Sequence, residues 1–173
     1  DVRWFAPKVG AGAMAFDGSD EFEIANRDDL NPGSGNFTIE FWVKFADVSV
    51  NNQQLFFKRN STYYGDIVLW WDSSNGIVIT TGTGGSGTDV SQGSTTGWAS
   101  NTWYHVAVVR VGTALNIYRD GTSVVSATNS IDIDNTGEFF IGSSDGGGYF
   151  TGYLDMFRMS KFARYTSGGF TLP

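Results

Sequence analysis

Several residue types are missing or scarce in this chain of 173 residues, and each scarcity excludes a class of protein. The chain has no cysteine, which excludes a disulfide-built scaffold and a thiol nucleophile but does not indicate a compartment. Basic residues are few, with 11 Lys and Arg against 18 Asp and Glu, so the formal net charge is −7. Nucleic acids and anionic membrane surfaces need a basic patch, so we expect neither as a partner.

Long apolar runs are also absent, and none approaches the ~20 residues of a membrane-spanning helix. We therefore expect no membrane insertion. What the chain does contain is glycine (23 residues) and aromatic side chains (16%), with only 17% charged residues. This composition favours short strands joined by glycine turns over helices. A chain of this length buries about 70% of its unfolded surface without staples, so we predict one domain over residues 1–173.

The clearest pattern lies in residues 36–46, where apolar and polar side chains alternate. The apolar set is Phe37, Ile39, Phe41, Val43 and Phe45. A period of two places this set on one face of an extended strand. Five large apolar side chains on one face need a facing layer, so the segment is predicted to be an inner strand of a packed sandwich.

No window shows sustained helical periodicity, so the whole chain is predicted to be nearly all β. The other expected strands are residues 13–16, 21–24, 55–58, 66–72, 77–81, 103–111, 115–119, 122–127, 139–142 and 149–160. Asp120-Gly121 suits a tight hairpin turn. Residues 82–97 are rich in Gly, Ser and Thr and are expected to form a long loop, with a weak edge strand around residues 88–91.

The order of short motifs resembles a known family. The motifs are Ala15-Phe16-Asp17-Gly18, then residues 37–44, 102–107, 117–121, 141–142 and 150–158. In this order and spacing they resemble the laminin-G-like domains of the concanavalin A-like lectin/glucanase superfamily, over about residues 13 to 165. The resemblance implies a jelly-roll β-sandwich of two antiparallel sheets. Residues 161–166 and 170–173 also resemble the ends of such domains in phage tail and other virion proteins.

The resemblance to glucanases does not extend to their catalytic residues. Those enzymes carry two glutamates around an aspartate on one strand, and no such run occurs here. Glu21 and Glu23 share a face without an aspartate between them. The one histidine, His105, lies in an apolar strand and is expected to have a structural role in the core or on a sheet face. We therefore expect no hydrolytic activity.

Calcium is a possible structural cofactor by the same resemblance. Relatives of this fold often hold an ion between the early Asp-Gly turn and an aspartate of the last long strand. The matching positions are Asp17 and Asp155, with Asp20 near the first in sequence. The alternative is that Asp17 shapes a turn and Asp155 caps backbone amides. An acidic loop at residues 132–135 has weaker support.

Carbohydrate binding needs aromatic rings for the C–H faces of sugars and planar polar groups for the hydroxyls. Residues 51–54, residues 60–64 and one face of the strand at residues 66–72 supply that mixture. The predicted ligand-binding residues are Trp70, Asp66, Asp72, Tyr63, Tyr64, Asn52, Trp98 and Tyr149. Trp70 is the strongest candidate because its own face is otherwise polar, whereas Trp42 and Trp103 are expected to be structural.

Together these features predict a non-catalytic, lectin-like module that binds a glycan or polysaccharide. We expect it to be secreted, displayed on a cell surface or associated with a virion, as part of a larger protein with other domains. The alternative is a structural or assembly domain of a phage tail or virion protein that has no sugar ligand.

Overall fold

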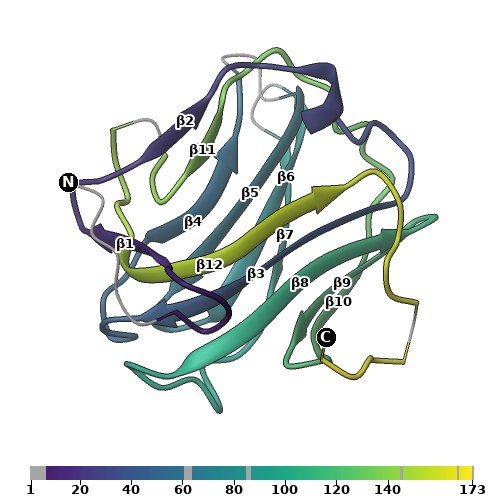
Figure 1. Ribbon diagram of the computed structural model, residues 1–173. Coiled ribbons are helices and arrows are strands. Elements are labelled where there is room, and N and C mark those ends of the chain that lie inside the picture. Colours follow the sequence, from purple (N-terminus) through teal and green to yellow (C-terminus); the bar gives the residue numbers. More distant parts are fainter. Residues whose placement is uncertain (1–6, 61–63, 85–86, 145, 167, 173) are drawn as a thin grey trace.

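The computed structural model describes residues 7–60, 64–84, 87–144, 146–166 and 168–172, without the side chains of residues 64–65, 83–84 and 87–90. In this part of the chain two antiparallel sheets face each other as a jelly-roll β-sandwich (Figure 1). The first sheet has the order β1-β12-β3-β8-β9-β10, and the second has the order β2-β11-β4-β5-β6-β7. The predicted all-β fold of two antiparallel sheets is confirmed.

The first sheet consists of β1 (Met14–Asp17), β12 (Thr151–Ser160), β3 (Phe37–Phe45), β8 (Trp103–Val111), β9 (Ala114–Arg119) and β10 (Thr122–Thr128). The second consists of β2 (Phe22–Ile24), β11 (Phe139–Ile141), β4 (Gln53–Lys58), β5 (Tyr64–Asp72), β6 (Gly76–Gly84) and β7 (Gly87–Gln92). One short 3-10 turn, η1 (Asp28–Leu30), follows β2. Among the described residues, no helix is long and apolar enough to cross a membrane.

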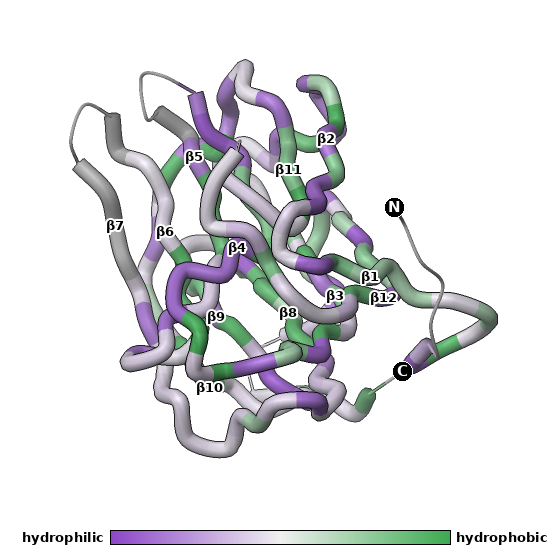
Figure 2. The backbone as a smooth tube through the Cα atoms, turned by 90° about the vertical axis from the view of Figure 1, so that its left-hand side faces the viewer, coloured by the Kyte–Doolittle hydropathy of each residue, from purple (hydrophilic) through white to green (hydrophobic). Residues whose placement is uncertain are grey.

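Strand β3 lies inside the first sheet, between β12 and β8. The apolar set predicted from the alternation is fully buried, with Phe37, Ile39, Phe41, Val43 and Phe45 each at 0% exposure. Each buried phenylalanine contributes about 1.5–3 kcal/mol of hydrophobic stabilisation. In Figure 2, green hydrophobic stretches alternate with purple hydrophilic ones along the strands. This alternation is what lets the two sheets share one core.

The glycine-rich residues 82–97 are more ordered than the sequence predicted. Strand β6 continues to Gly84, and β7 (Gly87–Gln92) pairs with it as the last strand of the second sheet. The weak edge strand expected near residues 88–91 is confirmed, but the long loop is wrong over much of its length. Backbone pairing with β6 supplies the hydrogen bonds that side-chain packing could not.

The C-terminal segment, as described for residues 161–166 and 168–172, covers part of the outward face of the first sheet (Figure 1, yellow). Its apolar side chains Ala163, Tyr165 and Phe170 pack against Ala107, Val109 and Tyr118 of β8 and β9. The rings of Tyr165 and Phe170 stack with centroids 3.5 Å apart and planes at 6°. The segment therefore acts as a strap that buries apolar residues on a sheet face.

Candidate functional site

The candidate site lies on the outward face of the second sheet, around Trp70 of β5. Alternation along β5 sends Ile67, Leu69 and Trp71 into the core and leaves Trp70 on the other face. There the Trp70 ring packs against the buried cluster of Phe57, Val68 and Phe140, while remaining partly exposed. A rigid aromatic ring with an apolar support and a free part of its surface can stack on a ligand.

Gln54 faces Trp70 from the neighbouring strand β4, because the two residues are direct partners in the strand register. Its amide nitrogen Nε2 donates to Oδ1 of Asn52 at 2.9 Å. Its amide oxygen Oε1 is buried and has no hydrogen-bond partner among the described residues. A buried acceptor without a partner costs about 1–3 kcal/mol.

The loop between β11 and β12 closes one side of this site. The carbonyl oxygen of Gly148 accepts a hydrogen bond from the Gln54 N–H at 2.8 Å. Gly148 has φ of +58°, and a Cβ there would lie 2.7 Å from Cγ of Gln54, so glycine allows the close approach. The partly exposed Tyr149 follows directly. The structure thus brings the predicted residues Asn52, Trp70 and Tyr149 to the same end of the second sheet. They lie around Gln54, which belongs to the predicted segment 51–54 but was not among the predicted ligand-binding residues.

Asp72 lies two residues beyond Trp70, where its carboxylate shapes the turn into β6. Oδ1 accepts the backbone N–H groups of Ser74 and Asn75, each at 2.8 Å. Hydrogen bonds of this kind are typical of an aspartate that fixes a turn. Asp72 lies beside the site, with much of its hydrogen-bonding capacity used locally, and its role in binding stays a prediction.

Asp66 lies at the opposite end of β5, four residues or about 13 Å from Trp70 along the strand. It was predicted to be a ligand-binding residue on a polar strand face, but its exposure is 2%, so it is buried away from a ligand. Oδ1 accepts from Asn60 N–H at 3.3 Å and from Asn135 Nδ2 at 3.5 Å. Burial raises the pKa of Asp66 to about 6, against the lowering effects of the Asn60 N–H and the Arg59 charge.

The structure does not place the side chains of the two tyrosines that were predicted to bind a ligand. Tyr63 lies outside the described residues, and of Tyr64 only the backbone, at the start of β5, is described. Their role in binding stays a prediction.

Trp98 is a core residue and not a platform for a ligand. Its exposure is 8%, and its ring centroid lies 5.9 Å from that of Phe45, 5.4 Å from that of Trp71 and 4.7 Å from that of Tyr104. These contacts leave no open ring face, so the prediction for Trp98 is corrected. Trp98 directly follows the glycine-rich residues 82–97, which were expected to form a loop. Its ring nevertheless packs on the core residues Phe45 and Trp71.

The three aspartates predicted to hold calcium do not form one site. The register pairs Asp17 with Thr151, which is four residues or about 13 Å from Asp155 on β12. Oδ2 of Asp155 accepts the N–H groups of Lys8 and Val9 at 3.1 and 3.0 Å, the capping role that was the alternative. The residues therefore do not fit a single shared ion.

Asp17 and Asp20 do lie together, in the turn after β1. Asp20 Oδ2 accepts the Asp17 N–H at 3.2 Å, and Asp17 Oδ1 accepts from the Ser19 N–H at 3.0 Å and the Ser19 hydroxyl at 2.7 Å. The hydrogen bonds from Ser19 lower the pKa of Asp17. Among the described residues, no group of three or more acidic, histidine or cysteine side chains could hold a metal ion. Calcium binding at this turn stays a prediction.

This acidic turn borders the end of the sandwich that carries the Trp70 site. Glu21 Oε2 accepts a hydrogen bond from the Ser143 hydroxyl and one from the Gly146 N–H, at 3.4 Å for the latter. Both donors belong to the loop that leads to Gly148 and Tyr149. Asp17 and Asp20 are part of the same turn, so the rim beside the site is negatively charged.

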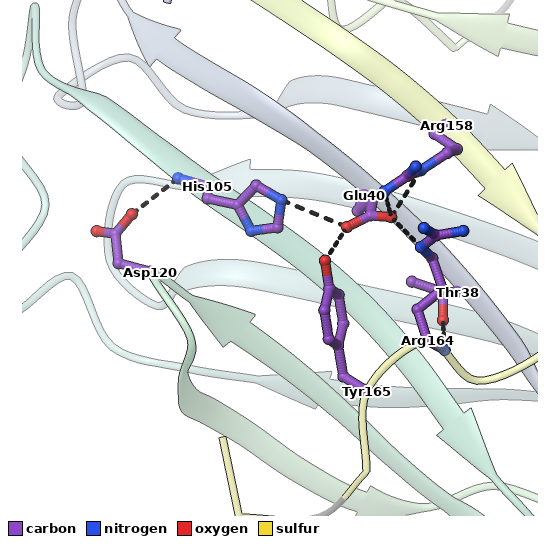
Figure 3. A network of polar contacts seen from close by, with 7 residues as sticks. All are labelled: Thr38, Glu40, His105, Asp120, Arg158, Arg164 and Tyr165. Atoms are coloured by element: carbon purple, nitrogen blue, oxygen red, sulfur yellow. Dashed lines mark hydrogen bonds and ion pairs between the residues drawn. The ribbon is translucent and has the colours of Figure 1, made fainter. Parts of the chain in front are cut away.

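A second polar cluster, which sequence reasoning did not find, lies on the outward face of the first sheet (Figure 3). Its centre is Glu40 of β3, which is 2% exposed. One carboxylate oxygen contacts Arg158 Nη2 at 2.5 Å and Arg164 Nε at 3.0 Å. The other accepts from the Tyr165 hydroxyl at 2.6 Å and lies 3.5 Å from His105 Nε2. The alternation in β3 gave the face of Glu40 but not its partners, three of which come from the distant C-terminal part of the chain.

The hydrogen-bond donors around Glu40 stabilise the ionised form of its carboxylate. Burial alone would raise the pKa of Glu40, but hydrogen bonds from His105, Tyr165 and Arg158 outweigh burial and lower the pKa to about 2. Burial and the hydrogen bond to Glu40 raise the pKa of Tyr165 to about 12. His105 thus has a structural place in this cluster, as predicted for a sheet-face residue. The cluster ties the C-terminal strap to the sheet.

The arrangement of the strands has counterparts among known proteins. A laminin G sequence profile, described as the concanavalin A-like lectin/glucanases superfamily, matches residues 16–166. No curated protein sequence matches the chain.

Solved structures match at low sequence identity, which shows the fold alone. Domain 4 of an extracellular arabinanase from Geobacillus stearothermophilus, solved with arabinotriose, has a TM-score of 0.75 and 21% identity over 94% of this chain and 76% of its own. The CBM40 domain of a Ruminococcus gnavus sialidase, solved with α2,3-sialyllactose, has a TM-score of 0.73 and 12% identity over 88% of this chain and 91% of its own.

Domains LG4-5 of the mouse laminin α1 chain have a TM-score of 0.66 and 14% identity, over 93% of this chain and 46% of theirs. The sequence match covers most of the chain, and the two-sheet architecture agrees with it. The chain therefore belongs to the concanavalin A-like lectin/glucanase superfamily, with a laminin G-like domain.

Proposed function

We propose that this protein is a non-catalytic carbohydrate-binding module whose site is the sheet face and rim around Trp70. The observation that carries the proposal is the partly exposed Trp70 ring, beside which Gln54 holds the exposed amide of Asn52. A sugar matches this arrangement, because its C–H face stacks on indole while its hydroxyls bond to an exposed amide. Asn52 and Tyr149 border the same place and supply further polar and aromatic contacts.

The similar structures support the class of ligand, since two of them were solved with arabinotriose and with sialyllactose. The negative charge of the rim narrows the range of sugars that we propose for this chain. Asp17, Asp20 and Glu21 lie beside the loop that closes the site. An anionic sugar would be repelled there, so we propose a neutral glycan or polysaccharide as the ligand.

Binding without hydrolysis agrees with the spacing of the carboxylates on this face. Glycosidases place two carboxyl groups about 5–9.5 Å apart across the scissile bond. Asp66 and Asp72 stand six residues apart on one strand, which corresponds to about 20 Å. They are too far apart to act on the same glycosidic bond.

The proposed site is shallow, because one ring and a few polar groups line an open sheet face. Such a site binds weakly by itself, and repetition on a larger assembly raises the effective affinity by avidity. We propose that the module acts in a secreted or surface-displayed protein, in keeping with the extracellular enzyme that carries one of the similar domains.

A glycan array with the protein displayed multivalently tests the proposal. We expect binding to neutral glycans and little binding to their sialylated or uronic-acid counterparts. Trp70→Ala should lower the affinity at least about tenfold, which corresponds to 1.4 kcal/mol. Gln54→Met, which keeps the size of the side chain but removes the amide, should weaken binding without unfolding the protein.

Trp103→Ala is the matched control, since Trp103 lies on the first sheet. It should leave glycan binding unchanged. A folded protein that binds no glycan, or one whose binding survives Trp70→Ala, would overturn the proposed site.

A further inference from the structure

A separate cavity of about 460 Å³ lies on the outward face of the first sheet, whereas Trp70 lies on the second. Val9, Trp42 and Met156 form apolar parts of its wall, and Glu40 and Arg158 form polar parts. The C-terminal strap covers the neighbouring part of this sheet face through Tyr165, which binds Glu40. The cavity is the part of the face that the strap leaves open, and its volume suits a small molecule.

The polar groups of the cavity wall also include His105, whose buried Nδ1 has no partner among the described residues, but Arg158 is the exposed one with donors to spare. Glu40 already accepts from Arg158, Arg164 and Tyr165, so it has little capacity left for a ligand. The guanidinium of Arg158 has five N–H donors and directs only Nε and Nη2 at Glu40, at 2.8 and 2.5 Å. Its side chain is 44% exposed. The remaining donors can reach an acceptor in the cavity.

Charged groups of both signs surround the cavity. The cations are Arg158, Arg164 and Lys8, whose Nζ lies 4.6 Å from the centroid of the Trp42 ring. The anions are Glu40, which binds the two arginines, Asp155, which accepts two backbone N–H groups, and Asp120, which accepts the His105 N–H at 2.9 Å. These carboxylates already accept donors of the protein, whereas the guanidinium of Arg158 keeps N–H groups that can bind an anion.

The edge of the cavity is built on a strained bulge. Met156 has φ of +52° and is 59% exposed, and the β12–β3 register shifts between Asp155 and Arg158. A left-handed conformation is unfavourable for a non-glycine residue. The bulge turns the Met156 side chain to the cavity and returns Arg158 to its place opposite Glu40. Such strain often accompanies a binding site.

We propose that this cavity binds a small amphipathic anion, that is, a ring or short aliphatic body that carries one carboxylate, sulfonate or similar group. The apolar body lies against Trp42 and Met156, and the anionic group accepts hydrogen bonds from Arg158. This binding is independent of the proposed carbohydrate site on the other sheet.

Two fluorescent probes that differ in one group test the charge requirement. The probes are 1-anilinonaphthalene-8-sulfonate and its uncharged analogue N-phenyl-1-naphthylamine, and both brighten in an apolar site. We expect one sulfonate probe per protein molecule, bound at least tenfold more tightly than the uncharged probe, with an affinity that falls as salt is added. Equal affinity for the two probes would overturn the proposal.

Met156→Asp and Met156→Asn form a matched pair of variants. Both side chains tolerate a left-handed backbone and have nearly the same size, so both proteins should fold, as equal melting temperatures would show. We expect the Asp variant to bind the sulfonate probe at least tenfold more weakly than the Asn variant. Equal binding by the two variants would place the probe elsewhere and contradict the proposal, whereas Trp70→Ala should leave probe binding unchanged.

Discussion

At the scale of single residues, Glu40 and Asp66 are two buried carboxylates whose surroundings differ. Glu40 is surrounded by donors from Arg158, Arg164 and Tyr165. Asp66 has two weak donors at 3.3 and 3.5 Å, and its Oδ2 has no partner among the described residues. The two groups therefore shift in opposite directions, with the pKa of Glu40 at about 2 and that of Asp66 at about 6.

Glu40 is expected to stabilise the fold most above pH 4.5. Its folded pKa is about 2, against an ordinary value of 4.5, so its contribution is lost as the pH falls from 4.5 toward 2. The loss amounts to at most about 3 kcal/mol. Glu40→Gln should lower the free energy of unfolding at pH 7 and remove much of this acid dependence, as denaturant titrations from pH 2 to 7 would measure. An unchanged acid limb in the variant would contradict the assignment.

Asp66 should have the opposite effect. Its pKa in the folded protein is about 6, above the ordinary value of 3.8, so protonation of Asp66 stabilises the fold. This stabilisation is fully present below pH 3.8 and is lost as the pH rises through 6. The cost at neutral pH is at most about 3 kcal/mol. Asp66→Asn keeps the acceptor that Asn60 and Asn135 use, and should raise the free energy of unfolding at pH 7 while leaving it unchanged at pH 3. A variant less stable than the parent at pH 7 would show that the charge is needed.

At the scale of elements, the C-terminal strap depends on a glycine in the β9–β10 turn. Gly121 has φ of +80°, and a Cβ there would collide with the carbonyl oxygen of Phe170. The Phe170 N–H also donates to the Gly121 carbonyl at 3.0 Å. Phe170 in turn lies against Tyr165 and Tyr118. The turn and the strap therefore hold each other.

Gly121→Ala and Gly112→Ala separate the strap from ordinary turn strain. Both glycines have positive φ in hairpin turns, but a Cβ at Gly112 would meet nothing within 4 Å. We expect Gly112→Ala to cost about 1 kcal/mol and Gly121→Ala at least about 1 kcal/mol more. Hydrogen exchange at residues 163–170 should rise in the Gly121 variant alone. Equal costs and equal exchange would mean that the strap is held elsewhere.

The strands could be predicted from the sequence because period-two alternation depends only on neighbouring residues. β3 and β5 follow it closely, β8 was predicted from an apolar run on both faces, and the Asp120-Gly121 hairpin follows from local turn chemistry. The site could be predicted only in part. Trp70 was found by the face it shares, whereas the burial of Trp98 and Asp66 depends on loops that fold back from elsewhere.

Buried polar residues inside the sandwich are harder still to predict. Arg110 lies at 0% exposure in the apolar strand β8, where its guanidinium donates to the carbonyls of Gly33, Gly35 and Ile131. Lys58 is equally buried, with Nζ bonded to Asn26 Oδ1 at 2.8 Å and to the Gly137 carbonyl at 2.6 Å. These partners are backbone and amide groups far along the chain, so local sequence patterns do not reveal them. They secure loops at the ends of the strands.

At the scale of the whole molecule, the two outward faces of the sandwich differ in chemistry. The second sheet presents an indole and the exposed amide of Asn52 beside an acidic rim. The first sheet presents an apolar cavity with spare guanidinium donors. The two proposed sites, for a neutral glycan and for a small anion, therefore lie on opposite sheets and do not overlap.

The most direct measurement of carbohydrate binding is a titration of the protein with a neutral oligosaccharide, followed by the NMR signals of the six tryptophan indoles. Carbohydrate binding at the proposed site predicts that the Trp70 indole N–H shifts in a saturable manner while the signal of Trp42, on the opposite sheet, stays in place. Assignment by single Trp→Phe variants identifies each signal. Saturable binding that leaves the Trp70 signal unmoved, or no binding by any neutral oligosaccharide, would contradict the proposed carbohydrate site.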